Sequence, residues 1–259
     1  MSDPIVVTRH PSWAEIRIDR EAKRNAMNRA ARQSLMRALS ELEASAKAVI
    51  ITGTGGSFCA GIDLKELHED RAREIEGGSE EWIAVNLAIR AHRAIFIAAV
   101  NGLALGGGAT LINVCDLAIS STDASIGCPE MGFATYPGMA GPAIQLSGIT
   151  RKRAAWLVLT ANRIDGATAE RWGMVNACVA PKELLPCARE LAQRIAGFDR
   201  VALAEAKKAL DCIPYPIGSL PMAMRYGQMV NQTIRAKTGA QAEGTARFAG
   251  GIKNPGQGL

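Results

Sequence analysis

The sequence has few aromatic residues and no long apolar run, and each shortage excludes a class of function. Aromatic residues make up only 5% of the 259 residues, and the lysines and arginines are scattered. The chain therefore lacks the stacking platform or basic stripe that RNA binding requires. The apolar run 94–100 is too short to cross a bilayer. We expect no nucleic-acid partner and no membrane span.

Cysteine and histidine are too dispersed for a metal site. The six cysteines, at positions 59, 115, 128, 178, 187 and 212, include no closely spaced pair, and the sequence has only three histidines. The N-terminus, Met-Ser-Asp-Pro-Ile-Val-Val, lacks the charged start and apolar core of an export signal. These absences predict no metal, reduced cysteines and a cytoplasmic protein.

Three common catalytic motifs are also missing. The chain contains no Gly-x-Ser-x-Gly, no phosphate loop ending in Gly-Lys-Ser/Thr and no Gly-x-Gly-x-x-Gly. Hydrolase, nucleoside triphosphatase and dinucleotide-binding functions therefore lack their signatures. A net charge of +5 and an isoelectric point near 9.0 favour an anionic ligand instead.

Hydrophobic patterning predicts an α/β protein. Residues 5–8 and 13–19 are typical of a hairpin, and Asn28 is placed to cap a helix over 29–44 that leads to a buried strand from Val49. Residues 63–79 are highly charged, and we expect a mobile loop there, with His68 and His92 on the surface. A helix over 80–93 and a buried strand over 94–100 follow.

From residue 182 onwards helical segments follow without strands, and we place a lobe boundary near Gly197. We expect helices over 182–196, 201–212, 220–237 and 240–249, and we divide the chain into a core, 1–197, and a helical lobe, 198–259. Met222, Met224, Met229 and Val230 would expose apolar surface in a monomer, so we expect subunits to pack through this lobe.

Two glycine-rich turns follow predicted strands. Gly106, Gly107 and Gly108 precede an apolar helix, and residues 55–61 follow the strand near Val49. Uncovered backbone N–H groups at a helix N-terminus attract negative charge and can stabilise a substrate oxyanion. A tight packing turn is the alternative for either segment.

A carboxylate that exchanges protons should lie near these turns. Glu130 follows Pro129 in an apolar neighbourhood, which would raise its pKa towards neutrality and suit it to acid/base catalysis. From the residues alone, a helix-capping or salt-bridged glutamate is equally compatible.

The motifs together resemble the crotonase (enoyl-coenzyme A hydratase/isomerase) superfamily. The resemblance rests on Gly-Ser-Phe-x-Ala-Gly-x-Asp-Leu at 56–64, Ala-Val-Asn-Gly-x-Ala-x-Gly-Gly-Gly at 99–108, Cys-Asp at 115–116 and Pro-Glu at 129–130, and extends to Glu243-Gly244. It implies a crotonase-like spiral of β-β-α units with a C-terminal helical trimerisation lobe. It also implies homotrimers or dimers of trimers acting on acyl-CoA, with coenzyme A as part of the substrate and no other cofactor.

The resemblance assigns roles to particular residues. The N–H groups of Ile62 and Gly107 would form the oxyanion hole, and Glu130 matches the second catalytic glutamate of the family. The residues matched to coenzyme A binding are Lys23, Arg24, Ala26, Ala60, Asp63, Leu64, Phe248 and Lys253. Those matched to the substrate pocket are Phe133, Tyr136, Pro137, Gly138 and, by a loose alignment, Tyr226.

One position departs from the hydratase pattern. Thr110 stands where hydratases of the family carry their first glutamate, and a hydroxyl can orient water but is a poor base. The resemblance therefore leaves isomerisation and hydration of an unsaturated acyl-CoA both open, with Thr110 as a second catalytic candidate. Hydration followed by carbon–carbon cleavage, as in hydroxycinnamoyl-CoA hydratase-lyases, and a non-catalytic acyl-CoA-binding or RNA-binding role are the alternatives.

Overall fold

A six-stranded sheet forms the centre of the protein in the computed structural model, which describes residues 3–75, 77–198, 200–212, 220–237 and 239–252. Its strands, in spatial order, are β1 (Ile5–Arg9), β2 (Trp13–Ile18), β3 (Ala48–Gly53), β5 (Ile95–Val100), β7 (Leu117–Ser121) and β10 (Ala177–Val179). β1 and β2 form the predicted antiparallel hairpin, with Ile5 opposite Ile18, and each later neighbour pairs in parallel.

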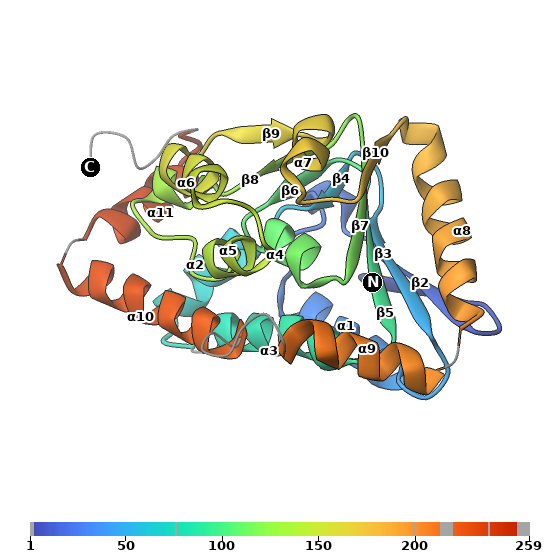
Figure 1. The fold of residues 1–259 in the computed structure, drawn as a ribbon. Coiled ribbons are helices and arrows are strands. Elements are labelled where there is room, and N and C mark those ends of the chain that lie inside the picture. Colours follow the sequence, from blue (N-terminus) through green and yellow to red (C-terminus); the bar gives the residue numbers. More distant parts are fainter. Residues whose placement is uncertain (1–2, 76, 199, 213–219, 238, 253–259) are drawn as a thin grey trace.

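A second sheet of short strands lies beside the first (Figure 1). It contains β4 (Ser57–Cys59), β6 (Leu103–Leu105), β8 (Ser125–Gly127) and β9 (Arg163–Asp165). The chain passes from β3 to β4, from β5 to β6 and from β7 to β8, each time before helical structure, which confirms the predicted β-β-α units. A glycine turn and a helix follow strand 94–100 as predicted, but hydrophobic periodicity did not predict β6, which lies between the strand and Gly106.

Helices cover both faces of the six-stranded sheet. α1 (Arg29–Leu42), α3 (Gly78–Ala91) and α4 (Gly107–Val114) enclose the larger apolar core. α8 (Leu184–Ala196) follows the short helix η3 (Pro181–Glu183) and packs on the opposite face, over a separate cluster (Figure 1). The Asn28 side chain accepts a hydrogen bond from Ala31 N at 3.0 Å, so the predicted cap of α1 is confirmed.

The segment predicted as a loop contains a helix, α2 (Leu64–Ala72). Asp63 Oδ1 accepts hydrogen bonds from the N–H groups of Lys65 and Glu66, and the Glu66 carboxylate accepts the N–H of Arg29 at the start of α1. These caps, rather than an apolar stripe, define the helix, which explains why hydrophobic patterning missed it.

His92 is buried, although we predicted it on the surface, whereas His68 is exposed as expected. His92 Nε2 lies 3.1 Å from Leu39 O and 3.0 Å from a carboxylate oxygen of Glu43, and its Nδ1 accepts the N–H of Ala94. Burial lowers its pKa, and the Glu43 carboxylate opposes that effect. His92 therefore joins the end of α3 to the end of α1.

The remaining helices connect or follow the strands, and the last three form the C-terminal part of the chain. They are η1 (Glu21–Lys23), η2 (Pro129–Phe133), α5 (Ala140–Leu146), α6 (Arg151–Thr160), α7 (Gly166–Trp172), α9 (Arg200–Cys212), α10 (Leu220–Lys237) and α11 (Ala240–Ala249). α10 packs on α5, and α11 contacts η2 and α2. Of the apolar residues expected to be exposed there, Met222 is exposed, but Met224 is fully buried; the side chains of Met229 and Val230 lie outside the described part. No described helix combines the length and apolarity needed to cross a bilayer.

Candidate active site

A cavity of about 160 Å³ lies where both glycine turns, η2 and the C-terminal helices meet. Its wall includes Ala60, Ile62 and Leu64 from the first turn, Gly106 and Gly107 from the second, and Glu130 and Phe133 from η2. The two turns, far apart in sequence, are brought together because β4 and β6 pair in parallel.

Gly61 and Gly107 approach each other so closely that neither position can hold a larger residue. A Cβ on Gly61, where φ is +88°, would lie 2.9 Å from Gly107 N, and a Cβ on Gly107 would lie 3.1 Å from the Gly61 Cα. The N–H of Met27 donates to Gly61 O at 2.7 Å and fixes the first turn from the other side. Gly107 begins α4, so its N–H has no acceptor within the helix.

The Glu130 carboxyl group packs against the second turn. Its Oε1 lies 2.6 Å from the point that a Gly106 Cβ would occupy, and its Oε2 is buried with no hydrogen-bond partner among the described residues. No ion pair to Glu130 is found in this described part, which argues against the salt-bridged alternative. Burial raises the pKa of Glu130 to about 7, and a backbone hydrogen bond opposes this shift.

Thr110 is fully buried on the helix that starts at the second turn. Its hydroxyl donates to Gly106 O at 3.3 Å, one helical turn back. The hydroxyl proton is therefore engaged with the carbonyl of the residue that precedes α4.

The residues matched to coenzyme A fall into several groups. Ala60 and Leu64 line the cavity, whereas Lys23 and Arg24 lie exposed at η1. The N–H of Ala60 donates to Arg24 O at 3.0 Å, so the basic loop lies directly against the first turn.

Other matched residues already have partners in the structure. The Asp63 carboxylate pairs with Arg20 at 3.0 Å, and Arg20 also donates to Ala26 O. Phe248 packs edge-on against Phe133, with ring centroids 5.3 Å apart. Lys253 lies outside the described residues.

The predicted substrate pocket is largely gathered at the same cavity. Phe133, Tyr136 and Gly138 line it, and the buried Pro137 accepts the N–H of Gly141 through its carbonyl at 2.7 Å. Tyr226 belongs to α10, but its side chain lies outside the described part.

Several cavity residues were not anticipated from the sequence. They are Leu67, Ser79, Thr135, Met139, Ala140, Gln228, Arg235, Gln241 and Thr245. The polar members on α10 and α11 carry no local motif, and only the packing of those helices brings them to the cavity.

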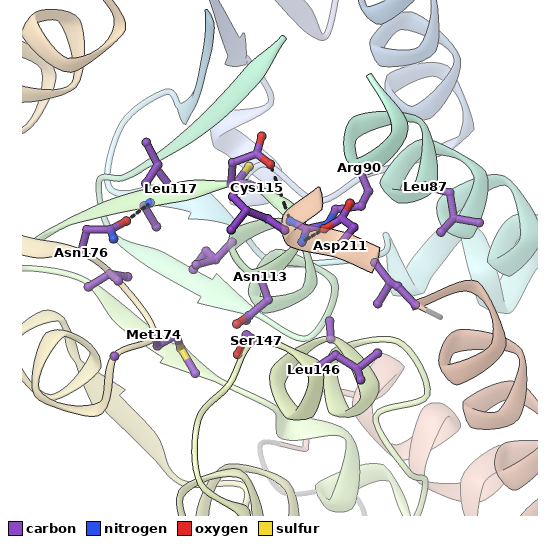
Figure 2. Close-up of a pocket in the computed structure, with 18 of the residues that line it drawn as sticks. Leu87, Arg90, Asn113, Cys115, Leu117, Leu146, Ser147, Met174, Asn176 and Asp211 are labelled. Atoms are coloured by element: carbon purple, nitrogen blue, oxygen red, sulfur yellow. Dashed lines mark hydrogen bonds and ion pairs between the residues drawn. The ribbon is translucent and has the colours of Figure 1, made fainter. Parts of the chain in front are cut away.

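A larger cavity, about 580 Å³, lies at the other end of α3 and α4 (Figure 2). Its charged groups are paired: Arg90 binds Asp211 and lies 3.7 Å from Asp116, which also binds Lys207 at 2.9 Å. Asn176 Oδ1 accepts the N–H of Ala118 at 2.9 Å. Because both glycine turns and Glu130 are elsewhere, the smaller cavity is the stronger candidate for catalysis.

Comparisons with known proteins identify the family and the fold. Residues 8–251 match the family model described as enoyl-CoA hydratase/isomerase. The short-chain-enoyl-CoA hydratase of Clostridium acetobutylicum is 33% identical over 213 residues, which cover 80% of each chain.

Solved structures show the same fold. Carnitinyl-CoA hydratase from Mycobacterium avium is 30% identical, with a TM-score of 0.81 over 98% of both chains. An enoyl-CoA isomerase from M. smegmatis, described as monofunctional, is 28% identical, with a TM-score of 0.67 over 86% of this chain and 99% of the other. The predicted crotonase-like α/β fold is confirmed.

Proposed function

Because the chain belongs to the enoyl-CoA hydratase/isomerase family, we propose that it isomerises an unsaturated acyl-CoA thioester, with Glu130 as the proton carrier. The observation that carries this proposal is the buried Glu130 carboxyl beside Gly106, which has no ion-pair partner among the described residues and a pKa raised to about 7. Such a group both accepts and returns a proton near neutral pH.

The two glycine turns would hold the thioester. The N–H groups of Ile62 and Gly107 donate to its carbonyl oxygen, and each donor stabilises the developing enolate by roughly 3 kcal/mol. Glu130 removes a proton from one carbon of the acyl group and returns it to another, which moves the double bond. Coenzyme A arrives with the substrate, and the reaction needs no further cofactor.

The environment of Thr110 favours isomerisation over hydration. Hydration needs a group that holds and deprotonates water, but the Thr110 hydroxyl donates to Gly106 O and is a poor base. Isomerisation needs only one carboxylate, and Glu130 supplies it. Hydration is the second candidate, because the Clostridium acetobutylicum relative is described as a hydratase.

The test is product analysis by liquid chromatography, which separates isomers of equal mass, followed by mass spectrometry. The protein is incubated with trans-2-enoyl, cis-3-enoyl and 4-hydroxycinnamoyl thioesters of coenzyme A. We expect interconversion of the two enoyl isomers at constant mass; addition of water would indicate hydration, and loss of a two-carbon thioester would indicate the lyase.

The variant Glu130→Gln is the matched control, since it keeps the side-chain shape but cannot carry the proton. We expect no turnover and nearly unchanged coenzyme A binding. Unchanged turnover would refute the role of Glu130. No turnover of any of the three thioesters by the wild-type protein would instead indicate acyl-CoA binding without catalysis.

We also propose that subunits associate as trimers or as dimers of trimers through the C-terminal helices. Met222 on α10 is 63% exposed and Leu210 on α9 is 70% exposed, so these helices present apolar surface in a single chain. Light scattering in solution would test this, and a monomer at micromolar concentration would refute it.

A further inference from the structure

Trp82 is a fully buried residue of α3 that the proposed reaction does not yet use. Its indole N–H has no hydrogen-bond partner among the described residues, although burial removes it from water. An indole nitrogen can only donate, and an unpaired buried donor destabilises the folded state. Such a group calls for an explanation.

The position of the indole nitrogen suggests one. A Cβ built on Gly107 would lie 2.7 Å from Trp82 Nε1 and 3.3 Å from Cε2, so the nitrogen edge of the ring faces Gly107. On the neighbouring residue, the corresponding point of Gly106 lies 2.6 Å from Glu130 Oε1. Gly107 therefore lies against the unpaired indole donor, and Gly106 lies against the carboxyl group of the proposed proton carrier.

Two nearby polar side chains form hydrogen bonds elsewhere and none to the indole N–H. Thr110, on the same helix as Gly107, donates its own hydroxyl to Gly106 O. Asn86 binds the backbone carbonyl of Trp82 at 2.7 Å and does not reach the ring nitrogen by any hydrogen bond in the described structure. The indole N–H beside Gly107 therefore has no acceptor among the described residues.

From this geometry we infer that Trp82 is a positioning residue of the oxyanion site. Its indole packs on Gly107, holds the Gly107 N–H in place, and adds a fixed positive potential where the thioester oxygen becomes negative. A preorganised dipole in a dry site acts strongly on developing charge without reorganising during the reaction. This role rests on the proposed function, because it requires a thioester carbonyl at the glycine turns.

The experiment measures polarisation of a bound carbonyl rather than turnover. The probe is butyryl-CoA labelled with carbon-13 at the thioester carbonyl, a saturated compound that the proposed reaction cannot convert. Infrared difference spectra of wild-type protein should show the carbonyl stretch displaced to lower frequency on binding. The displacement should be smaller in Trp82→Phe and in a variant carrying 3-benzothienylalanine at position 82, in which sulfur replaces the N–H at nearly constant shape.

Kinetics provide a second measurement. Both variants should lose about tenfold in kcat with little change in KM, less than the loss for a donor that contacts the oxygen directly. Trp13→Phe is the control: Trp13 is buried in the cluster under α8 and stacks on His10 at 3.7 Å, so its change should leave the carbonyl frequency and kcat unaltered.

The outcomes separate this inference from the proposed function. A wild-type displacement that persists in both variants would refute the role of Trp82 alone. Loss of the displacement in Trp82→Phe but not in the benzothienyl variant would show that ring shape acts, and would refute the electrostatic role. No displacement in wild-type protein would refute the oxyanion site itself, and the role of Trp82 with it.

Discussion

Ionisation of Glu130 should destabilise the folded protein, and the size of the effect follows from its environment. Burial raises its pKa from the ordinary 4.5 to about 7, so between these values the folded state binds more protons than the unfolded state. The free energy of unfolding must therefore fall as pH rises through this interval, and it levels off above pH 7. The difference between the two pKa values corresponds to about 3 kcal/mol.

Glu130→Gln isolates this contribution, because an amide of the same shape does not ionise. Urea unfolding of the wild-type and variant proteins is measured from about pH 4 to pH 8. The variant should gain up to about 3 kcal/mol relative to wild type as pH rises, and the difference between the two proteins should be smallest at the acid end. Parallel stability curves would refute a buried, unpaired carboxyl, because an exposed or ion-paired glutamate gives no such divergence.

Three further substitutions, the first with a matched control, test the packing at the glycine turn and two ion-pair networks. Gly107→Ala should lower kcat at least tenfold, since its Cβ cannot fit at the turn, while Gly56→Ala, whose Cβ would meet nothing within 4 Å, should leave kcat unchanged. Arg32→Met should reduce the free energy of unfolding by about 1 to 2 kcal/mol, because it removes the buried guanidinium that pairs with Glu66 and Glu81, both partly exposed and both still bound by Arg29; urea denaturation measures this, and no change would contradict it. Lys207→Met should reduce the free energy of unfolding by about 2 kcal/mol, because the largely buried Asp116 loses its closest cation and keeps only Arg90 at 3.7 Å, yet it should leave kcat unchanged; altered kcat would show that this distant ion pair does affect the site.

Local patterning predicted the elements whose residues carry their own signals. The hairpin follows from alternating apolar residues, and α1 follows from Asn28 at its start and leucines at helical spacing. The helices after Gly197 begin and end close to the predicted residues for the same reason.

Hydrophobic patterning did not predict the elements and contacts that depend on residues distant in sequence. β4 and β6 have three residues each, too short for a periodic signal, and exist because they pair with each other. The burial of His92 depends on α1, which supplies both Leu39 O and the adjacent Glu43. Likewise, Arg235 and Gln241 reach the cavity only through the packing of α10 and α11.

The site itself was predictable to the extent that it consists of backbone and one side chain. Glycine turns and an isolated Pro-Glu pair are visible in sequence, and the structure brings Ile62, Gly107 and Glu130 to one cavity. Their catalytic roles remain predictions. Trp82 could not have been singled out, because an unpaired indole N–H is a property of three-dimensional packing.

Two glutamates near the cavity show what distinguishes a proton carrier from a structural carboxylate in this fold. Burial alone would raise the pKa of Glu81, but hydrogen bonds and charge from Arg32 and Arg29 outweigh burial and lower it. Glu130 forms no ion pair with a described cation, so burial prevails. Since Glu81 is held ionised between two arginines, it ties α3 to α1 and cannot readily return a proton. The lack of an ion pair to Glu130 within the described part of the chain is therefore as important to the proposed chemistry as the glycines that make room for its carboxyl group.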